Sequence, residues 1–227
     1  MRQVPDPVQA LVDKAQRIVA FTGAGMSAES GLETYRDAET GLWENVDPTA
    51  MASIDAWARN PNPMWRWYLE RARRASEAKP NAGHRALASF RVITQNIDNL
   101  HERGGSQEVI HLHGSLFDYR CTICSRPYKG KLPHTPPACP LCGNLIRPGV
   151  VWFGEMLPTK EWARAEELIQ ECDLLIVVGT SGIVQPAASL PLLARNVLEI
   201  SPDETNLTPI ASYSWRTTAA QGLPLLF

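Results

Sequence analysis

The sequence lacks long hydrophobic runs, internal repeats and an excess of charge of either sign. Its longest strongly apolar run, Leu174–Val178, is far too short to cross a bilayer. Residues 1–16 mix charged and apolar side chains, without the continuous apolar stretch of a secretion signal. The 22 basic residues nearly balance 24 acidic ones, for a net charge of −2. The net positive charge typical of nucleic-acid-binding proteins is therefore lacking. We therefore expect neither a membrane partner nor a specific nucleic-acid partner.

Cysteine is also scarce, with five residues in 227. Without a secretion signal, reduced thiols or metal ligation are favoured over disulfides, and the expected location is the cytoplasm. Four of the cysteines form two Cys-x-x-Cys pairs, a spacing typical of four-cysteine zinc sites. Two disulfides or four buried thiols are the alternatives, and the fifth cysteine, Cys172, is expected to pack in the core. The predicted ligands of one structural zinc ion are Cys121, Cys124, Cys139 and Cys142.

Short apolar runs alternate with helical patterns along most of the chain. This alternation predicts an α/β fold with a parallel sheet covered on both faces. Between residues 117 and 144 the pattern gives way to Cys, Pro and basic residues, which predicts a small module held together by the metal. Two helix-to-strand junctions, near Phe90 and Arg195, look unusually abrupt, and we infer that loop residues are missing there. The expected strands are 17–21, 92–94, 109–112, 174–178 and 197–200, and the main helices 7–14, 62–78 and 162–171.

A glycine-rich turn, Gly23-x-Gly25-x-x-Ala28, follows the first strand-like run. Glycines let backbone N–H groups approach a pyrophosphate, although such a turn can also serve chain geometry alone. A dehydrogenase would need a second strand ending in an acidic residue about twenty residues further on. Residues 34–49 are polar and rich in turn formers instead. The sequence therefore disfavours hydride transfer and favours a long loop over a bound dinucleotide.

Several motifs together resemble the sirtuin family of NAD-dependent lysine deacylases. They occur in the family's order and cover the chain from Arg17 to Leu225. The motifs are Gly-Ala-Gly-Met-Ser-Ala-Glu-Ser-Gly at 23–31, Thr-Tyr-Arg-Asp at 34–37, Thr-Gln-Asn-Ile-Asp-Asn-Leu-His at 94–101, His-Leu-His-Gly-Ser at 111–115, the four cysteines, Val-Trp-Phe-Gly-Glu at 151–155 and Gly-Thr-Ser at 179–181.

The resemblance implies a Rossmann-like NAD-binding domain formed by residues 1–40, 80–116 and 146–227. A smaller domain would combine a helical module, 41–79, with the zinc module, 117–145. NAD would be the cofactor, and acyl-lysine proteins or peptides would be the partners. In the implied reaction, the acyl carbonyl oxygen attacks the nicotinamide ribose, nicotinamide leaves, and the acyl group passes to ADP-ribose.

His113 resembles the family's general base, and an imidazole suits proton transfer near neutral pH. His111, on the same side of a strand, is expected to be structural; an isolated His-x-His would otherwise indicate a core pair or a metal pair. Asn96 and Asp98 suit a carboxamide and a ribose, although both residue types also commonly cap turns. The cofactor-binding residues implied by the resemblance are Gly23, Ala24, Gly25, Ser27, Ala28, Glu29, Thr34, Tyr35, Arg36, Trp43, Gln95, Asn96, Ile97, Asp98, His113, Gly179, Thr180, Ser181, Ser201, Pro202, Asp203 and Ala219.

The segment at 151–155 resembles the family's substrate-binding strand, to which an extended peptide adds through main-chain hydrogen bonds. A buried structural strand is the alternative. The residues implied to bind substrate here are Val151, Trp152, Phe153, Gly154 and Glu155.

Tyr68 and Arg71 lie three residues apart, on one face of a predicted helix. A guanidinium can bind a carboxylate through two hydrogen bonds, and a phenol can add a third. The pair resembles the signature of sirtuins that remove succinyl, malonyl or glutaryl groups, and Ala52 stands where that class keeps a small residue. The alternative is that the arginines of this helix merely face water.

Two other functions remain open at this point. One is a sirtuin-like mono-ADP-ribosyltransferase, and the other is a non-enzymatic reader of NAD or acyl-lysine. His113 argues against a reader, because binding alone needs no base. Tyr68 and Arg71 argue against a transferase, because they would select an acyl group that it does not consume.

Overall fold

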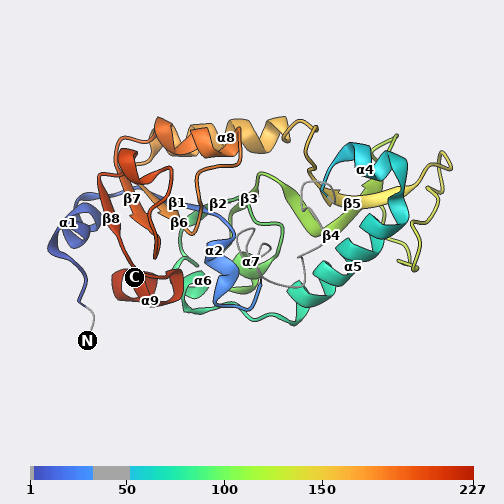
Figure 1. Ribbon diagram of the computed structural model, residues 1–227. Helices are drawn as coiled ribbons and strands as arrows, with labels where there is room; N and C mark the ends of the chain where they lie inside the picture. The colour runs from blue at the N-terminus through green and yellow to red at the C-terminus, as the bar shows by residue number, and fades with distance from the viewer. Residues whose placement is uncertain (1–2, 33–51) are drawn as a thin grey trace.

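A parallel six-stranded sheet forms the centre of the larger part of the molecule (Figure 1). The computed structural model describes residues 3–32 and 52–227. The strand order β3-β2-β1-β6-β7-β8 reverses direction between β1 and β6, the usual place for a ligand in an open α/β sheet. The α/β prediction is confirmed. The strands are β1 Ile18–Thr22, β2 Arg91–Thr94, β3 Val109–His111, β6 Leu174–Val178, β7 Val197–Ile200 and β8 Tyr213–Trp215.

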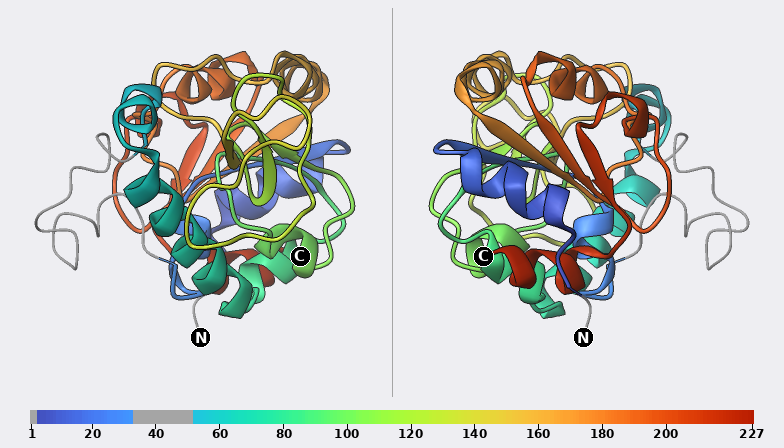
Figure 2. Two further views of the ribbon diagram at one scale, coloured as in Figure 1. Left: turned by 90° about the vertical axis from the view of Figure 1, so that its right-hand side faces the viewer. Right: turned by 90° about the vertical axis from the view of Figure 1, so that its left-hand side faces the viewer.

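Helices cover both faces of this sheet, because its central strands are apolar on both sides. All five residues of β6 are buried, and successive side chains enter opposite cores. Leu175 and Val177 pack toward α8 and η2, whereas Ile176 packs toward α1 and α9 (Figures 1 and 2). These elements are α1 Asp6–Lys14, α2 Gly25–Ala28, α6 Ala82–Ala86, α7 Leu100–Arg103, α8 Thr159–Glu171, η2 Ala187–Leu193, η3 Thr208–Ile210 and α9 Ala219–Leu226. No helix within the described ranges is long and apolar enough to cross a membrane.

The smaller part lies at the end of the molecule far from both termini (Figure 1). It contains α4 Ile54–Arg59, α5 Pro61–Glu77 and an antiparallel pair, β4 Gly114–Cys121 and β5 Ile146–Val150. The Trp65 indole N–H of α5 donates to the Pro133 carbonyl at 2.8 Å, which ties the helix to the cysteine-rich loops. One core is shared by α5, β4 and β5. The division into two domains at the residues given above stays a prediction, and β4 runs across one of its boundaries.

The abrupt junctions expected from the sequence are not abrupt in the structure. The helix expected to reach Phe90 ends at Ala86, and η2 ends at Leu193. Residues 87–90 and 194–196 therefore connect each helix to its strand, within the usual range. The expected abruptness thus came from a wrong helix boundary, whereas the inference that loop residues are missing at these junctions stays a prediction.

Candidate active site

Two glycine-containing loops meet at the point between β1 and β6 where the strand order reverses. One follows β1 and the other follows β6, and Gly25 N–H donates to the Gly179 carbonyl at 2.8 Å. A Cβ atom at Gly25 would lie 2.8 Å from Gly179 Cα, and Gly179 has a φ of +61°. Glycine is therefore required at both positions by the contact between the loops. This is the chain-geometry alternative that the sequence analysis left open beside approach to a pyrophosphate.

Side chains from three loops converge beside this contact. The Ser27 hydroxyl donates to Asp98 Oδ2 at 3.0 Å and accepts from the Asn96 amide at 3.2 Å. The Gln95 amide donates to Thr180 Oγ1 at 2.9 Å. Burial raises the pKa of the Asp98 carboxyl. Residues that were predicted to bind one cofactor thus lie together, although they are up to 153 positions apart, Ser27 to Thr180.

Two buried histidines extend this polar network; the sequence analysis quoted His101 as the end of the 94–101 motif but assigned a role to neither histidine. His84 Nε2 lies 3.4 Å from Ser27 Oγ, and His101 Nε2 lies 3.0 Å from Thr22 Oγ1. The rings are 4.9 Å apart. Burial lowers the pKa of His84 to about 4 and that of His101 to about 3, so both rings are neutral at pH 7. Each lies on a helix of five residues or fewer, too short to give a periodic signal.

His113 is partly buried, with one ring nitrogen occupied. Its Nδ1 lies 3.0 Å from the Gln95 carbonyl oxygen and must donate to it, because that oxygen can only accept. In the neutral ring, Nε2 then carries the lone pair that a general base needs. Burial lowers the pKa of His113, and the hydrogen bond to Gln95 only partly offsets this. The ring is therefore unprotonated and able to accept a proton at neutral pH.

His111 has partners at both ring nitrogens. Nδ1 lies 2.9 Å from the Asn96 carbonyl oxygen and Nε2 lies 2.7 Å from Glu102 Oε1. Burial opposes a charge on this ring, but Glu102 and the Asn96 carbonyl raise its pKa on balance. His111 therefore joins the loop after β2 to α7, as expected of a structural residue.

The segment 151–155 is not a continuous strand, contrary to the sequence expectation. Within it, only Phe153 forms a β-bridge, to the chain at Ser53. Its N–H donates to the Ala52 carbonyl at 2.8 Å, and its carbonyl accepts from Ile54 N–H at 3.3 Å. Gly154, with a φ of +87°, turns the chain immediately afterwards. At the other end, Val151 N–H donates to the His113 carbonyl at 2.9 Å. The segment therefore lies directly between His113 and the Ala52 region.

Two carboxylates in the predicted sets have protein partners. Glu155 pairs with the buried Arg147 and accepts a hydrogen bond from Trp152 N–H. Glu29 accepts from Ala220 N–H at 3.0 Å, at the start of α9. Neither contact has a sequence signal, because each depends on a residue from another element.

The remaining predicted cofactor residues fall into two groups. Those described lie at the carboxyl end of the sheet: Ala24 and Ala28 in and beside α2, Ile97 after β2, Ser181 after β6, Ser201, Pro202 and Asp203 after β7, and Ala219 at the start of α9. Thr34, Tyr35, Arg36 and Trp43 lie outside the described residues.

Tyr68 of α5 is buried beside the 151–155 segment, 6.0 Å from Trp152 between ring centroids. Arg71 is half-buried, and its guanidinium lies over the Trp67 ring at 4.7 Å. Three other arginines of the helix, Arg66, Arg73 and Arg74, are exposed. The expectation that all the arginines of this helix merely face water therefore does not hold for Arg71.

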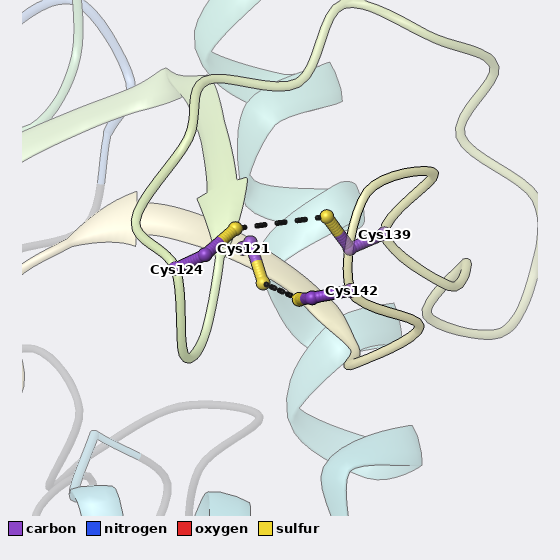
Figure 3. Close-up of side chains that lie close together, drawn as sticks. All are labelled: Cys121, Cys124, Cys139 and Cys142. Carbon is purple, nitrogen blue, oxygen red and sulfur yellow. Dashed lines mark hydrogen bonds between the residues drawn. The ribbon is translucent and has the colours of Figure 1, made fainter.

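The four cysteine sulfurs lie within 4.8 Å of one another (Figure 3). Sγ of Cys121 lies 3.4 Å from that of Cys142, and the Cys124 and Cys139 sulfurs are 3.8 Å apart. A tetrahedral zinc ion with Zn–S bonds of about 2.3 Å separates its sulfurs by about 3.8 Å, so the cluster fits one ion. None of these cysteines forms a disulfide, and Cys172 is buried elsewhere, as expected.

Comparisons with known proteins agree with this site. The model of the Sir2 family matches residues 23–186. The chain is 60% identical to a protein named NAD-dependent protein deacylase 2 of Corynebacterium efficiens, over 96% of this chain and 94% of that protein. It superposes on a Sir2 homologue bound to NAD with a TM-score of 0.92 and 44% identity, covering 99% of this chain and 93% of the other. It also superposes on a Sir2 complex with deacetylated p53 peptide and 3′-O-acetyl ADP-ribose, with a TM-score of 0.86 and 31% identity. This superposition covers 96% of this chain and 95% of the other. This chain is an enzyme of the Sir2 family.

Proposed function

We propose that this enzyme is an NAD-dependent protein lysine deacylase that uses His113 as its general base and accepts acyl groups ending in a carboxylate. The observation that carries the proposal is the position of His113. Its ring is held by the loop that follows β2, and its backbone is hydrogen-bonded to the 151–155 segment. One residue thus joins the proposed NAD side to the proposed peptide side.

NAD would bind at the carboxyl end of β1 and β6, and the residues there fit it. The chain around Gly23 and Gly25 has no room for a Cβ atom at either position. Glycines of this kind are typical of a dinucleotide-binding turn, in which the backbone must make close contacts. The buried Asn96 and Asp98 supply amide and carboxylate groups of the kind that recognise a carboxamide and a ribose hydroxyl. When bound, NAD supplies the ribose carbon that receives the acyl oxygen as nicotinamide leaves. Curated relatives are named for the same cofactor.

His113 would take the proton of a ribose hydroxyl at Nε2. Nδ1 is fixed by Gln95, so the ring cannot present the wrong nitrogen without breaking that hydrogen bond. The peptide would lie along residues 151–153, where the exposed Phe153 marks the accessible end of the segment. Cytoplasmic proteins carrying acyl-lysine are the proposed substrates.

The acyl preference rests on Tyr68 and Arg71. Tyr68 is buried against Trp152 of the peptide segment, and Arg71 lies one helical turn away over the Trp67 ring. A guanidinium can stack on an indole and also bind a planar carboxylate through its N–H groups. Ala52, whose carbonyl is bonded to Phe153, adds little volume on the same side.

The test compares Arg71→Met with the wild type on succinyl-lysine and acetyl-lysine peptides of one sequence. A charge-assisted hydrogen bond contributes roughly 1.5–3 kcal/mol, so KM for the succinyl peptide should rise by about ten- to a hundredfold, with little change for acetyl. Tyr68→Phe should act in the same direction but less, because a neutral hydrogen bond contributes about 0.5–1.5 kcal/mol.

Mass spectrometry of the products separates the alternatives. Equal weakening of both peptides by Arg71→Met would mean that Arg71 holds the helix and does not read the acyl group. If the wild type deacylates the acetyl-lysine peptide but not the succinyl-lysine peptide, the proposed acyl preference is refuted and the deacylase function stands. ADP-ribosylated protein without deacylated peptide would favour the transferase, and no product from either peptide would favour a reader.

A further inference from the structure

Arg147 is the one buried arginine or lysine side chain in the described ranges, with 1% of its surface exposed. A buried guanidinium is costly unless its charge is paired and its N–H groups have acceptors. Here Nη1 donates to Glu155 Oε1 at 2.5 Å, and Nη2 donates to Glu155 Oε2 at 2.8 Å and to the Val150 carbonyl at 2.9 Å. Nε donates to the Pro148 carbonyl at 3.3 Å. Arg147, the second residue of β5, is thus fixed in one geometry.

Glu155 closes the segment that β5 leads into. Its Oε2 accepts from Trp152 N–H at 2.9 Å, and its own N–H donates to the Trp152 carbonyl at 3.0 Å. Gly154, with a positive φ, makes the turn between these two residues possible. The pair Arg147–Glu155 therefore holds Val150, which precedes the segment, and Trp152 and Glu155 within it.

The same arginine also fixes the Trp152 ring. Its guanidinium carbon lies 3.4 Å from the centroid of the indole, a close cation–π contact. The buried indole N–H has no hydrogen-bond partner within the described ranges, so the ring is held by its faces. The indole also packs on Trp57 at 5.2 Å and on Tyr68 at 6.0 Å. A shift of Arg147 would therefore move the wall beside Tyr68.

The loops of the proposed NAD site have their own contacts. Ser27, Asn96 and Asp98 bond to one another, and Gln95 bonds to Thr180. Within the described ranges, the hydrogen bonds and ion pairs of Arg147 and Glu155 reach none of these five residues. A change at the ion pair should consequently affect the peptide side and spare the cofactor side.

We propose that Arg147 and Glu155 are positioning residues of the substrate site, which hold the 151–155 backbone and the Trp152 ring in the geometry that binds acyl-lysine peptide. The inference rests on the proposed deacylase function. Neither residue touches the reacting atoms. Their contribution is to peptide binding, so it belongs to KM for the peptide and not to the affinity for NAD.

The experiment uses a double variant, Arg147→Met with Glu155→Leu, because removing one charge alone would leave the other buried and unpaired. Glu155→Gln is the milder second variant, since it keeps the size of the side chain and removes the charge. Arg73→Met is the matched control: Arg73 pairs with Glu70 and Glu77 on the exposed side of α5. Zinc content and NAD binding by calorimetry show whether each variant is folded.

The expected result is a rise of about tenfold or more in KM for acetyl-lysine peptide in the double variant, the size of one lost charge-assisted hydrogen bond. kcat and the Kd for NAD should change little, the pattern of lost uniform binding. Glu155→Gln should show a smaller rise, and Arg73→Met none.

A peptide KM equal to that of the wild type in both pair variants would overturn the inference while leaving the deacylase function intact. Equal losses in peptide KM and NAD affinity would also overturn it, because the pair would then be a general scaffold. Absence of peptide turnover in the wild type would refute the proposed function itself.

Discussion

His113 is the residue at which ring geometry and protonation can be tested together. Burial lowers its pKa below the ordinary 6.5, so the neutral base persists at that pH. We expect kcat/KM to fall on the acidic side with a midpoint below pH 6.5, as the ring becomes protonated. A pH–rate profile measures the acidic limb.

The matching variants are His113→Gln and, as a control, His134→Gln, which changes an exposed histidine of the zinc module. Loss of a general base typically costs about 10²- to 10⁴-fold in rate. Near-normal turnover by a folded His113→Gln protein, or an acidic limb above pH 6.5, would exclude His113 as the base.

At the residue scale, the sequence identified chemical types better than it identified partners. Asn96, Asp98 and His113 could be picked out because each stands in a short motif that resembles the family's. The partners of Glu29 and Glu155 could not be predicted, since Ala220 N–H is 191 positions from Glu29 and the Arg147 guanidinium belongs to another element, β5. Contacts between elements follow from the fold, and one sequence contains no local signal for them.

The zinc module is the element whose stability depends most directly on a ligand. Structural zinc binding contributes on the order of 10 kcal/mol, comparable with the whole stability of a typical domain. We expect about one zinc per chain by metal analysis. Cys139→Ser should lose it and unfold the module, with a shift in the fluorescence of Trp65, whose N–H is bonded to Pro133 in that module.

Cys172→Ser is the control for this variant, because Cys172 lies outside the cluster and its thiol donates to the Ile169 carbonyl. It should keep one zinc. Protein purified without chelator that contains no zinc, or a Cys139→Ser protein with unchanged metal content, would contradict the assignment.

Elements with a strong apolar signal were predicted most accurately. β6 and β7 have the predicted bounds, and α5 differs by one residue at each end. β8 and α9 were not predicted: β8 has only three residues, and α9 contains Pro224, which argues against a helix in the sequence alone. The 151–155 segment does not form the strand expected from the sequence, because only Phe153 forms a β-bridge and Gly154, with a positive φ, turns the chain after it.

At the scale of the molecule, the proposed site and the short connections lie at opposite ends of the sheet. The strands are parallel, so the loops after β1, β2, β6 and β7 share the carboxyl end, whereas 87–90 and 194–196 enter strands at the amino end. The alignment with the Corynebacterium efficiens protein spans 238 positions, more than the 227 residues of this chain, so that relative has residues with no counterpart here.

The global stability of the protein should depend on pH through His84 and His101. Both are neutral in the folded protein because burial lowers their pKa, to about 4 and about 3, from the ordinary 6.5. As pH falls below 6.5 the unfolded chain takes up these protons and the folded protein does not. The stabilisation is therefore present in full above pH 6.5 and is lost progressively below it. His111 has a raised pKa, so it opposes this trend until the pH is below 6.5, where it becomes protonated in both states and adds no further pH dependence.

Urea unfolding between pH 7 and pH 5 measures the effect before most carboxylates titrate. Each buried imidazole should lower the free energy of unfolding by up to about 1.4 kcal/mol per pH unit. His101→Gln should reduce this slope by the contribution of one proton, because glutamine does not titrate, even if the variant is less stable at every pH. His134→Gln, at an exposed position, should leave the slope unchanged. A slope that is the same in His101→Gln and the wild type would mean that His101 is already protonated in the folded protein, and that Thr22 and the neighbouring His84 ring accommodate a charge at this buried position.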